Sequence, residues 1–146
     1  MYEDALARVD LFSDLDKKEL KDLATYCGER TFSPGSVLLS QGEQGLGLFI
    51  LTKGTVRITR KNSPDGVEEV LGTAGVGDVI GEMALLDDLP RSATVTAVDE
   101  VTVLLLPLWE FRRILRQILR SNPDAGLGLL SVLSRRLRKA EQRTLD

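Results

Sequence analysis

Helical periodicity marks the beginning of the chain. Apolar side chains recur there at spacings of three and four, as one face of a helix requires, at Leu20, Leu23, Ala24 and Cys27. Asp16 stands just before this face and Glu19 follows three residues later, which is the spacing of a capping box. The pattern predicts N-terminal helices within residues 1–30.

The middle of the chain, residues 31–106, has a different pattern. Short runs rich in Val, Ile, Leu and Thr alternate with Gly, Pro and Asp, as in "SVLLSQGE", "GLFILTKGTVRITRK" and "SATVTAVDE". Asp65-Gly66 adds a hairpin signal. Strand–turn units at this spacing predict a mainly β fold with flanking helices, an antiparallel jelly-roll β-barrel.

Helical spacing returns in residues 107–146. Pro107 precedes the run "LWEFRRILRQILR", and Asn122-Pro123 marks a cap followed by a new first helical position. The last helix carries an apolar stripe formed by Leu130, Leu133, Leu137 and Ala140. This stripe fits two arrangements, packing on the β unit of the same chain or against a second copy of itself.

Length and composition place the chain among globular proteins. It has 146 residues, 42% hydrophobic and 28% charged, which predicts a single domain over residues 1–146. Cys27 is the only cysteine, which favours a reducing compartment. The sequence has no apolar run long enough to span a bilayer and no secretion signal at its N-terminus, so we predict a cytoplasmic location.

The sequence contains no histidine, and this limits the chemistry open to it. Imidazole metal sites and His-dependent catalysis are excluded, and a cupin-type enzyme would lack its histidine ligands. We therefore expect neither a metal nor an enzymatic activity. Residues 109–146 hold nine Lys or Arg and four Asp or Glu, a net charge of +5, so the rest carries −8. We interpret this basic tail as the solvated face of two helices and expect no specific DNA binding by the chain alone.

A carboxylate and a guanidinium frame the apolar segment between Glu82 and Arg91. A short helical turn there would expose main-chain N–H groups, and Ala84 is small enough to let an anion approach them. The planar fork of an arginine suits a phosphate, and a glutamate accepts hydrogen bonds from a sugar hydroxyl. A phosphate beside a hydroxyl describes a cyclic nucleotide, although an ion pair between Glu82 and Arg91 that closes a loop has the same spacing.

The segment 80–95 resembles a known motif. "GEMALLDDLPRSATV" is similar to the phosphate-binding cassette of cyclic nucleotide-binding domains, which runs Phe-Gly-Glu-aliphatic-Ala-Leu and ends in Pro-Arg-x-Ala-Ser/Thr-Val. Ile80 stands in place of the usual aromatic residue. The upstream stretches "GLFILTKGTV" and "GVGDVIGE" also resemble this family, so the likeness covers nearly the whole chain.

The resemblance implies a role for each matching position. Glu82 would bind the ribose 2′-hydroxyl, and Arg91 would bind the cyclic phosphate. Ile58 and Leu71 would line the wall beside the base under a lid made by the last helix. In the transcription-activator branch two hydroxyl residues of that helix contact the base, but here Ala140 and Glu141 stand at those places, which leaves Arg138 as the candidate. The implied ligand-binding set is Gly81, Glu82, Met83, Ala84, Arg91, Ser92, Ala93, Leu71, Ile58 and Arg138.

The resemblance also implies a function. We expect a regulatory sensor domain that couples binding of a cyclic nucleotide to movement of its C-terminal helices. Ser92 directly after the cassette arginine favours cAMP over cGMP, because threonine at that place tends to favour cGMP in the family. The expected partners are the nucleotide and either a second copy of the chain or an effector domain outside it. The alternative is a docking or dimerisation module that has the fold but binds no nucleotide.

Overall fold

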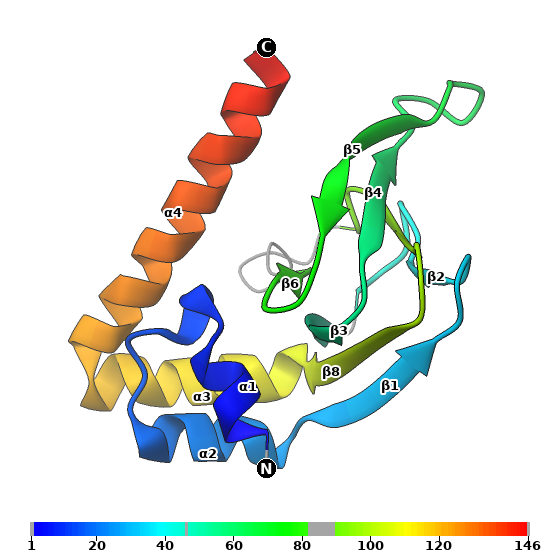
Figure 1. Cartoon of the computed structure of the whole chain (residues 1–146). Helices are drawn as coiled ribbons and strands as arrows, with labels where there is room; N and C mark the ends of the chain where they lie inside the picture. The colour runs from blue at the N-terminus through cyan, green and yellow to red at the C-terminus, as the bar shows by residue number, and fades with distance from the viewer. Residues whose placement is uncertain (1, 46, 82–89, 146) are drawn as a thin grey trace.

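The protein is arranged in three layers, a helical layer and two β-sheets (Figure 1). The computed structural model describes residues 2–45, 47–81 and 90–145, with side chains up to residue 138. The first sheet has the order β1-β8-β3-β6 and the second has the order β2-β7-β4-β5. The helices pack on one face of the first sheet, and the second sheet faces the other.

All strand pairs are antiparallel. The strands of the first sheet are β1 (Gly28–Phe32), β8 (Val101–Pro107), β3 (Gly47–Lys53) and β6 (Val79–Ile80). Those of the second are β2 (Val37–Leu39), β7 (Thr94–Ala97), β4 (Val56–Arg60) and β5 (Glu69–Ala74). The two sheets form an open roll rather than a closed barrel, and they confirm the predicted mainly β fold with flanking helices.

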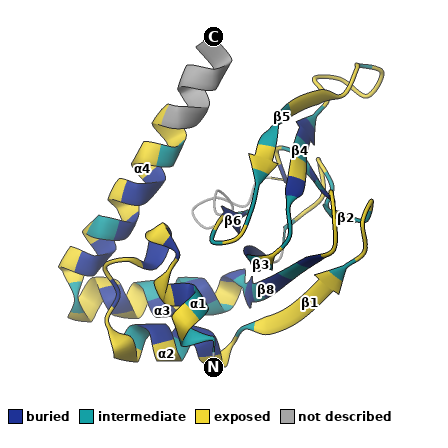
Figure 2. Cartoon of the chain, viewed as in Figure 1, coloured by how far each residue is buried: buried dark blue, intermediate teal, exposed yellow. Residues whose placement is uncertain are grey.

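The strand β3 is apolar without alternation because both of its faces are covered. Leu48 and Ile50 belong to the cluster that packs against the helices, which we call the helical cluster. Phe49 and Leu51 point the other way, into the cluster between the sheets, which we call the roll cluster. Successive side chains of a strand leave opposite faces, so a central layer needs apolar residues at every position. Figure 2 shows β8 as a largely buried strand of this layer.

The second sheet alternates instead, because its outer face meets solvent. Val95 and Ala97 of β7 are buried, whereas Thr94 and Thr96 between them are half-buried. This period of two is typical of a sheet with one covered face. The hairpin signal at Asp65-Gly66 is confirmed, because residues 61–68 connect β4 to its antiparallel partner β5.

Three short helical segments open the chain, α1 (Glu3–Ala7), the 3-10 helix η1 (Asp10–Phe12) and α2 (Lys17–Thr25). The predicted capping box is confirmed: the Glu19 main-chain N–H donates to Asp16 Oδ1 over 2.8 Å, and the Asp16 N–H donates to Glu19 Oε1 over 2.9 Å. Strand β1 begins at Gly28, two residues before the predicted end of the helical segment, because the chain pairs with β8 soon after α2 ends.

Two helices close the chain, α3 (Leu108–Ser121) and α4 (Pro123–Leu145). The predicted cap is confirmed, since Asn122 Oδ1 accepts from the N–H of Ala125. The predicted stripe is only partly right: Leu133 is buried, but Leu130 and Leu137 are 46% and 48% exposed. The buried face is formed by Ala125, Leu129, Val132 and Leu133, and these residues belong to the helical cluster. The packed face therefore rests on the helical layer, because α3 and η1 border it.

Candidate functional site

Arg91 is the buried cation of the candidate site, with 9% of the residue exposed. Its Nη2 donates to the carbonyl oxygen of Gly47 over 2.6 Å, and its Nη1 donates to that of Gly81 over 3.2 Å. Gly47 is the first residue of β3 and Gly81 directly follows β6, so the guanidinium joins two strands of the first sheet. Buried charges need such hydrogen bonds, and these two fix the plane of the guanidinium.

The main chain of Arg91 is held by the same loop that holds its side chain. The N–H of Arg91 donates to the Glu43 carbonyl over 2.8 Å, and the Gly42 N–H donates to the Arg91 carbonyl over 2.9 Å. Gly42 and Glu43 thus hold the main chain of Arg91, and Gly47 holds its guanidinium. This arrangement anchors Arg91 at both its main chain and its guanidinium.

Glycines surround the guanidinium, and only one of them was among the predicted site residues. A Cβ atom placed on Gly45 or on Gly81 would overlap the Arg91 guanidinium. Gly81 has φ +90°, which also favours glycine. The sequence reading missed Gly45 and Gly47, although the run "GEQGLG" at residues 42–47 is an available signal.

The predicted wall residues lie on the second sheet. Ile58 of β4 pairs with Val95 and with Gly72, is half-buried, and packs against the roll cluster. Leu71 of β5 is also half-buried and lies at the irregularity where the pairing of β4 and β5 shifts. Ile58 therefore faces the space between the sheets, as the predicted role requires.

The remaining predicted residues fall into three groups. Ser92 and Ala93 follow Arg91 directly, the first exposed and the second half-buried. Arg138 is exposed on α4, a helix that begins at the end of α3 and projects out of the helical layer in Figure 1. The positions Glu82, Met83 and Ala84 lie outside the described residues.

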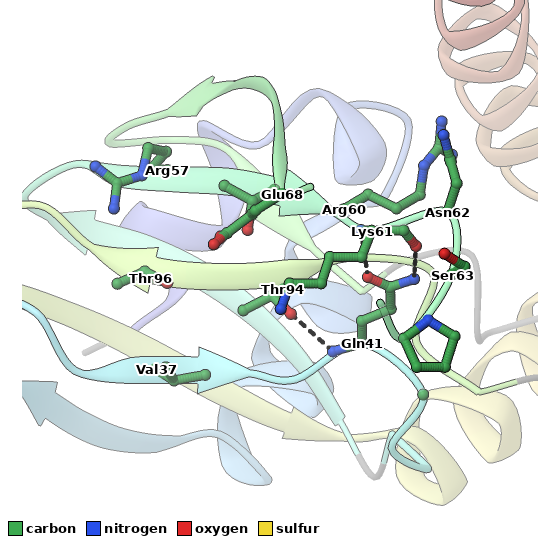
Figure 3. A pocket seen from close by; sticks show the side chains of 13 residues that line it. Val37, Gln41, Arg57, Arg60, Lys61, Asn62, Ser63, Glu68, Thr94 and Thr96 are labelled. Carbon is green, nitrogen blue, oxygen red and sulfur yellow. Dashed lines mark hydrogen bonds between the residues drawn. The ribbon is translucent and has the colours of Figure 1, made fainter. Parts of the chain in front are cut away.

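A concavity lies on the outer face of the second sheet. It is a groove of about 690 Å³ whose lining includes Thr94 and Thr96 (Figure 3). At one end the Gln41 side chain bridges to the main chain of Lys61, donating from Nε2 over 2.7 Å and accepting at Oε1 over 2.8 Å. Because Thr94 and Thr96 alternate with the inward-facing Val95, this groove is separate from the space between the sheets.

Over residues 2–45, 47–81 and 90–145, no group of three or more Cys, Asp or Glu side chains is placed to hold a metal ion. In the same part of the chain, no helix is both long and apolar enough to cross a membrane.

Comparison with known proteins identifies the family. The family model for the cyclic nucleotide-binding domain matches residues 29–118. The chain is 31% identical over 144 residues to a CRP-like cAMP-activated global transcriptional regulator of Mycobacterium tuberculosis, covering 99% of this chain. It is 36% identical over 119 residues to a cAMP-dependent protein kinase regulatory subunit of Yarrowia lipolytica, covering 82% of this chain. The chain therefore belongs to the cyclic nucleotide-binding domain family.

A solved structure supports the same assignment. The regulatory domain of Toxoplasma gondii protein kinase A, crystallised with cAMP, superposes with a TM-score of 0.81 at 25% identity, covering 95% of this chain and 49% of that one. This chain spans 62% of the mycobacterial regulator and 31% of the yeast regulatory subunit. The relatives are thus regulatory proteins that extend beyond the part matched here.

Proposed function

We propose that this chain is a sensor domain that binds a cyclic nucleotide and acts by binding rather than by catalysis. The observation that supports it is the buried Arg91 guanidinium, which donates to two main-chain carbonyls and belongs to the arginine that matches the family's cassette motif. A guanidinium carries five N–H groups in a fixed fork geometry. Its planar fork matches the oxygens of a phosphate.

The proposed contacts follow the family cassette. Arg91 binds the cyclic phosphate with help from the Ser92 hydroxyl, and Glu82 accepts from the ribose 2′-hydroxyl. Main-chain N–H groups near Met83, Ala84 and Ala93 complete the phosphate contacts. In support, Ser92 is exposed beside the buried Arg91 and is open to a ligand.

For the base, we propose contacts with Ile58 and Leu71 and a preference for cAMP over cGMP. Ile58 presents a half-buried apolar side chain toward the space between the sheets. Ser92 carries the preference for cAMP, and Arg138 of α4 is the proposed contact from the lid. Paired calorimetric titrations test this, with tighter binding of cAMP expected and tighter binding of cGMP contradicting it.

Replacing Arg91 tests the phosphate contact. We expect Arg91→Ala to weaken cAMP binding by ~2–5 kcal/mol, because the phosphate would be left poorly paired in a partly desolvated site. Arg57→Ala is the matched control, since Arg57 is exposed and lines the outer groove. Calorimetry of both variants decides the matter, and unchanged affinity of the Arg91 variant contradicts the proposal.

The alternative of a docking module that binds no nucleotide is tested by thermal unfolding. A ligand that binds only the folded state, at ~100 times its dissociation constant, adds ~2.7 kcal/mol of stability. We expect such a shift with cAMP. If neither cAMP nor cGMP shifts the unfolding of the wild-type chain, the docking module is the better description.

We further propose that binding is coupled to the position of α4. An ion pair joins α4 to the helical layer, with Arg136 Nη2 at 2.6 Å from Asp10 Oδ1. A ligand moves such a helix only if it binds one position more tightly than the other. Hydrogen exchange of α4 with and without cAMP measures this, and identical protection contradicts the coupling.

A second copy of the chain is the proposed partner of α4. In the part of this helix whose side chains the structure describes, three leucines are exposed in the single chain, namely Leu127, Leu130 and Leu137. Large exposed apolar side chains gathered on one helix are typical of an interaction surface. Sedimentation equilibrium of the wild-type chain tests this, and a monomer at all concentrations leaves an effector domain outside the chain as the partner.

A further inference from the structure

The reason for a glycine at position 45 differs from the reason at the other glycines around Arg91. Gly42 and Gly81 have φ of +87° and +90°, so their backbone alone favours glycine. A Cβ on Gly47 would meet Leu105 Cδ1 and the Leu106 carbonyl oxygen. The φ of Gly45 lies outside the left-handed region, so its backbone is open to any residue.

The obstacle at Gly45 is Arg91 itself. The three atoms nearest to a Cβ built there are all atoms of the Arg91 side chain, Cζ, Nε and Nη2. The guanidinium thus lies directly against the main chain of residue 45, in space that any side chain would fill. From that place its Nη2 reaches the Gly47 carbonyl and its Nη1 reaches the Gly81 carbonyl.

We propose that Gly45 is a positioning residue for the phosphate-binding arginine. The inference rests on the proposed role of Arg91 and adds a residue that acts through it. With no side chain at position 45, the guanidinium settles between the two carbonyls and keeps one orientation before the nucleotide arrives. A preordered arginine loses less side-chain entropy on binding, and its donors already point where they are needed.

The same loop makes this positioning specific to Arg91. Gly42 and Glu43 hold the main chain of Arg91 through two hydrogen bonds, so the Cα cannot drift to restore the contact. A methyl group at residue 45 therefore displaces the guanidinium rather than the whole residue. The geometry predicts a loss of affinity from a residue that does not itself touch the ligand.

The test is Gly45→Ala, with Gly28→Ala as its matched control. Gly28 lies in β1, has an ordinary φ, and has no atom within 4 Å of a Cβ built on it. We expect Gly45→Ala to bind cAMP ~10–100-fold more weakly, the equivalent of one charge-assisted hydrogen bond. Gly28→Ala should bind like the wild type. Wild-type affinity in Gly45→Ala overturns the inference.

A thermodynamic cycle without ligand separates positioning from a general structural effect. Thermal unfolding is measured for the wild type, Gly45→Ala, Arg91→Ala and the double variant. If the added methyl group acts by displacing the guanidinium, it destabilises the chain that has Arg91 and has little effect in the chain that lacks it. Equal effects in both backgrounds overturn the inference.

A failure of the proposed function and a failure of the positioning role give different experimental results. If the wild-type chain binds neither cAMP nor cGMP, the function fails although positions 45 and 91 are still coupled in unfolding. If the wild type binds and Arg91→Ala does not, while Gly45→Ala binds normally, the function stands and the positioning role fails.

Discussion

The two hydrophobic clusters lie on opposite faces of the first sheet and are filled to different degrees. Within the described residues, the helical cluster contains 21 buried apolar residues, whereas the roll cluster contains eight. The helical cluster draws on both ends of the chain and includes a tilted pair of rings, with Phe12 and Phe111 at 5.8 Å between centroids. The roll cluster is bordered by half-buried residues such as Ile58 and Ala74.

This difference assigns stability mainly to the helical side of the first sheet and binding mainly to the roll side. Removing atoms from the side chains of a packed cluster lowers the free energy of unfolding. The helical side therefore serves as the scaffold. The roll side keeps partly covered apolar side chains on β4 and β5, and Arg91 is anchored to the loop before β3 and to the end of β6. Changes on the helical side should therefore lower stability, and changes on the roll side should lower affinity.

The largest effect on stability is expected on the helical side. Phe111→Ala should lower the free energy of unfolding by ~3–5 kcal/mol, because a buried ring leaves a cavity. Trp109→Ala on the same helix is the control, since Trp109 is 62% exposed, and its change should stay within about 0.5 kcal/mol. Urea unfolding measures both. A loss of cAMP affinity in the folded Phe111 variant as large as that of Arg91→Ala would break the comparison.

A smaller loss of stability is expected on the roll side. Ile58→Ala should cost about 1–2 kcal/mol of unfolding free energy, because the side chain is already half exposed. Its effect on cAMP affinity should be several-fold, since the variant removes apolar surface that faces the proposed base. Urea unfolding and calorimetry on the same sample give both numbers. If Ile58→Ala binds cAMP with full affinity and loses as much unfolding free energy as Phe111→Ala, Ile58 belongs to the scaffold instead.

The smallest effect concerns Cys27, which lies where α2 gives way to β1. Burial raises the pKa of the Cys27 thiol from 9.0 to about 11. Its Sγ donates to the Leu23 carbonyl over 3.5 Å and it packs against the helical cluster. The thiol stays protonated in the folded chain at pH values where an unfolded chain loses the proton. Its contribution to stability is therefore complete below pH 9.0 and is lost as the pH rises through about 11.

The comparison of wild type with Cys27→Ala isolates this contribution. The difference between their unfolding free energies should be constant below pH 9.0. Above that pH the wild type should lose stability relative to Cys27→Ala. Affinity for cAMP should be the same for both, because the thiol lies on the helical side. A constant difference across the whole range would mean that the thiol is not desolvated.

Much of the fold follows from local sequence patterns. The capping box at Asp16 and Glu19 formed as predicted, since both partners are within one turn of the same helix. Alternation in β7 and continuous apolar character in β3 correspond to one covered face and two covered faces. The sequence also carried the cassette motif, which led to the family before any contact was known.

Other features depend on residues that are distant in sequence. The apolar stripe of α4 could not reveal that Leu133 packs while Leu130 and Leu137 remain exposed, because the helix offers several apolar faces and its neighbours select one. The setting of Arg91 likewise depends on carbonyl oxygens 44 and 10 residues away in the chain. The sequence by itself determined the capping box, the apolar patterns of β3 and β7 and the identity of the arginine, because those depend on neighbouring residues. Only the tertiary structure decided where its guanidinium lies, because the loop at residues 42–47 and the end of β6 meet there only after folding.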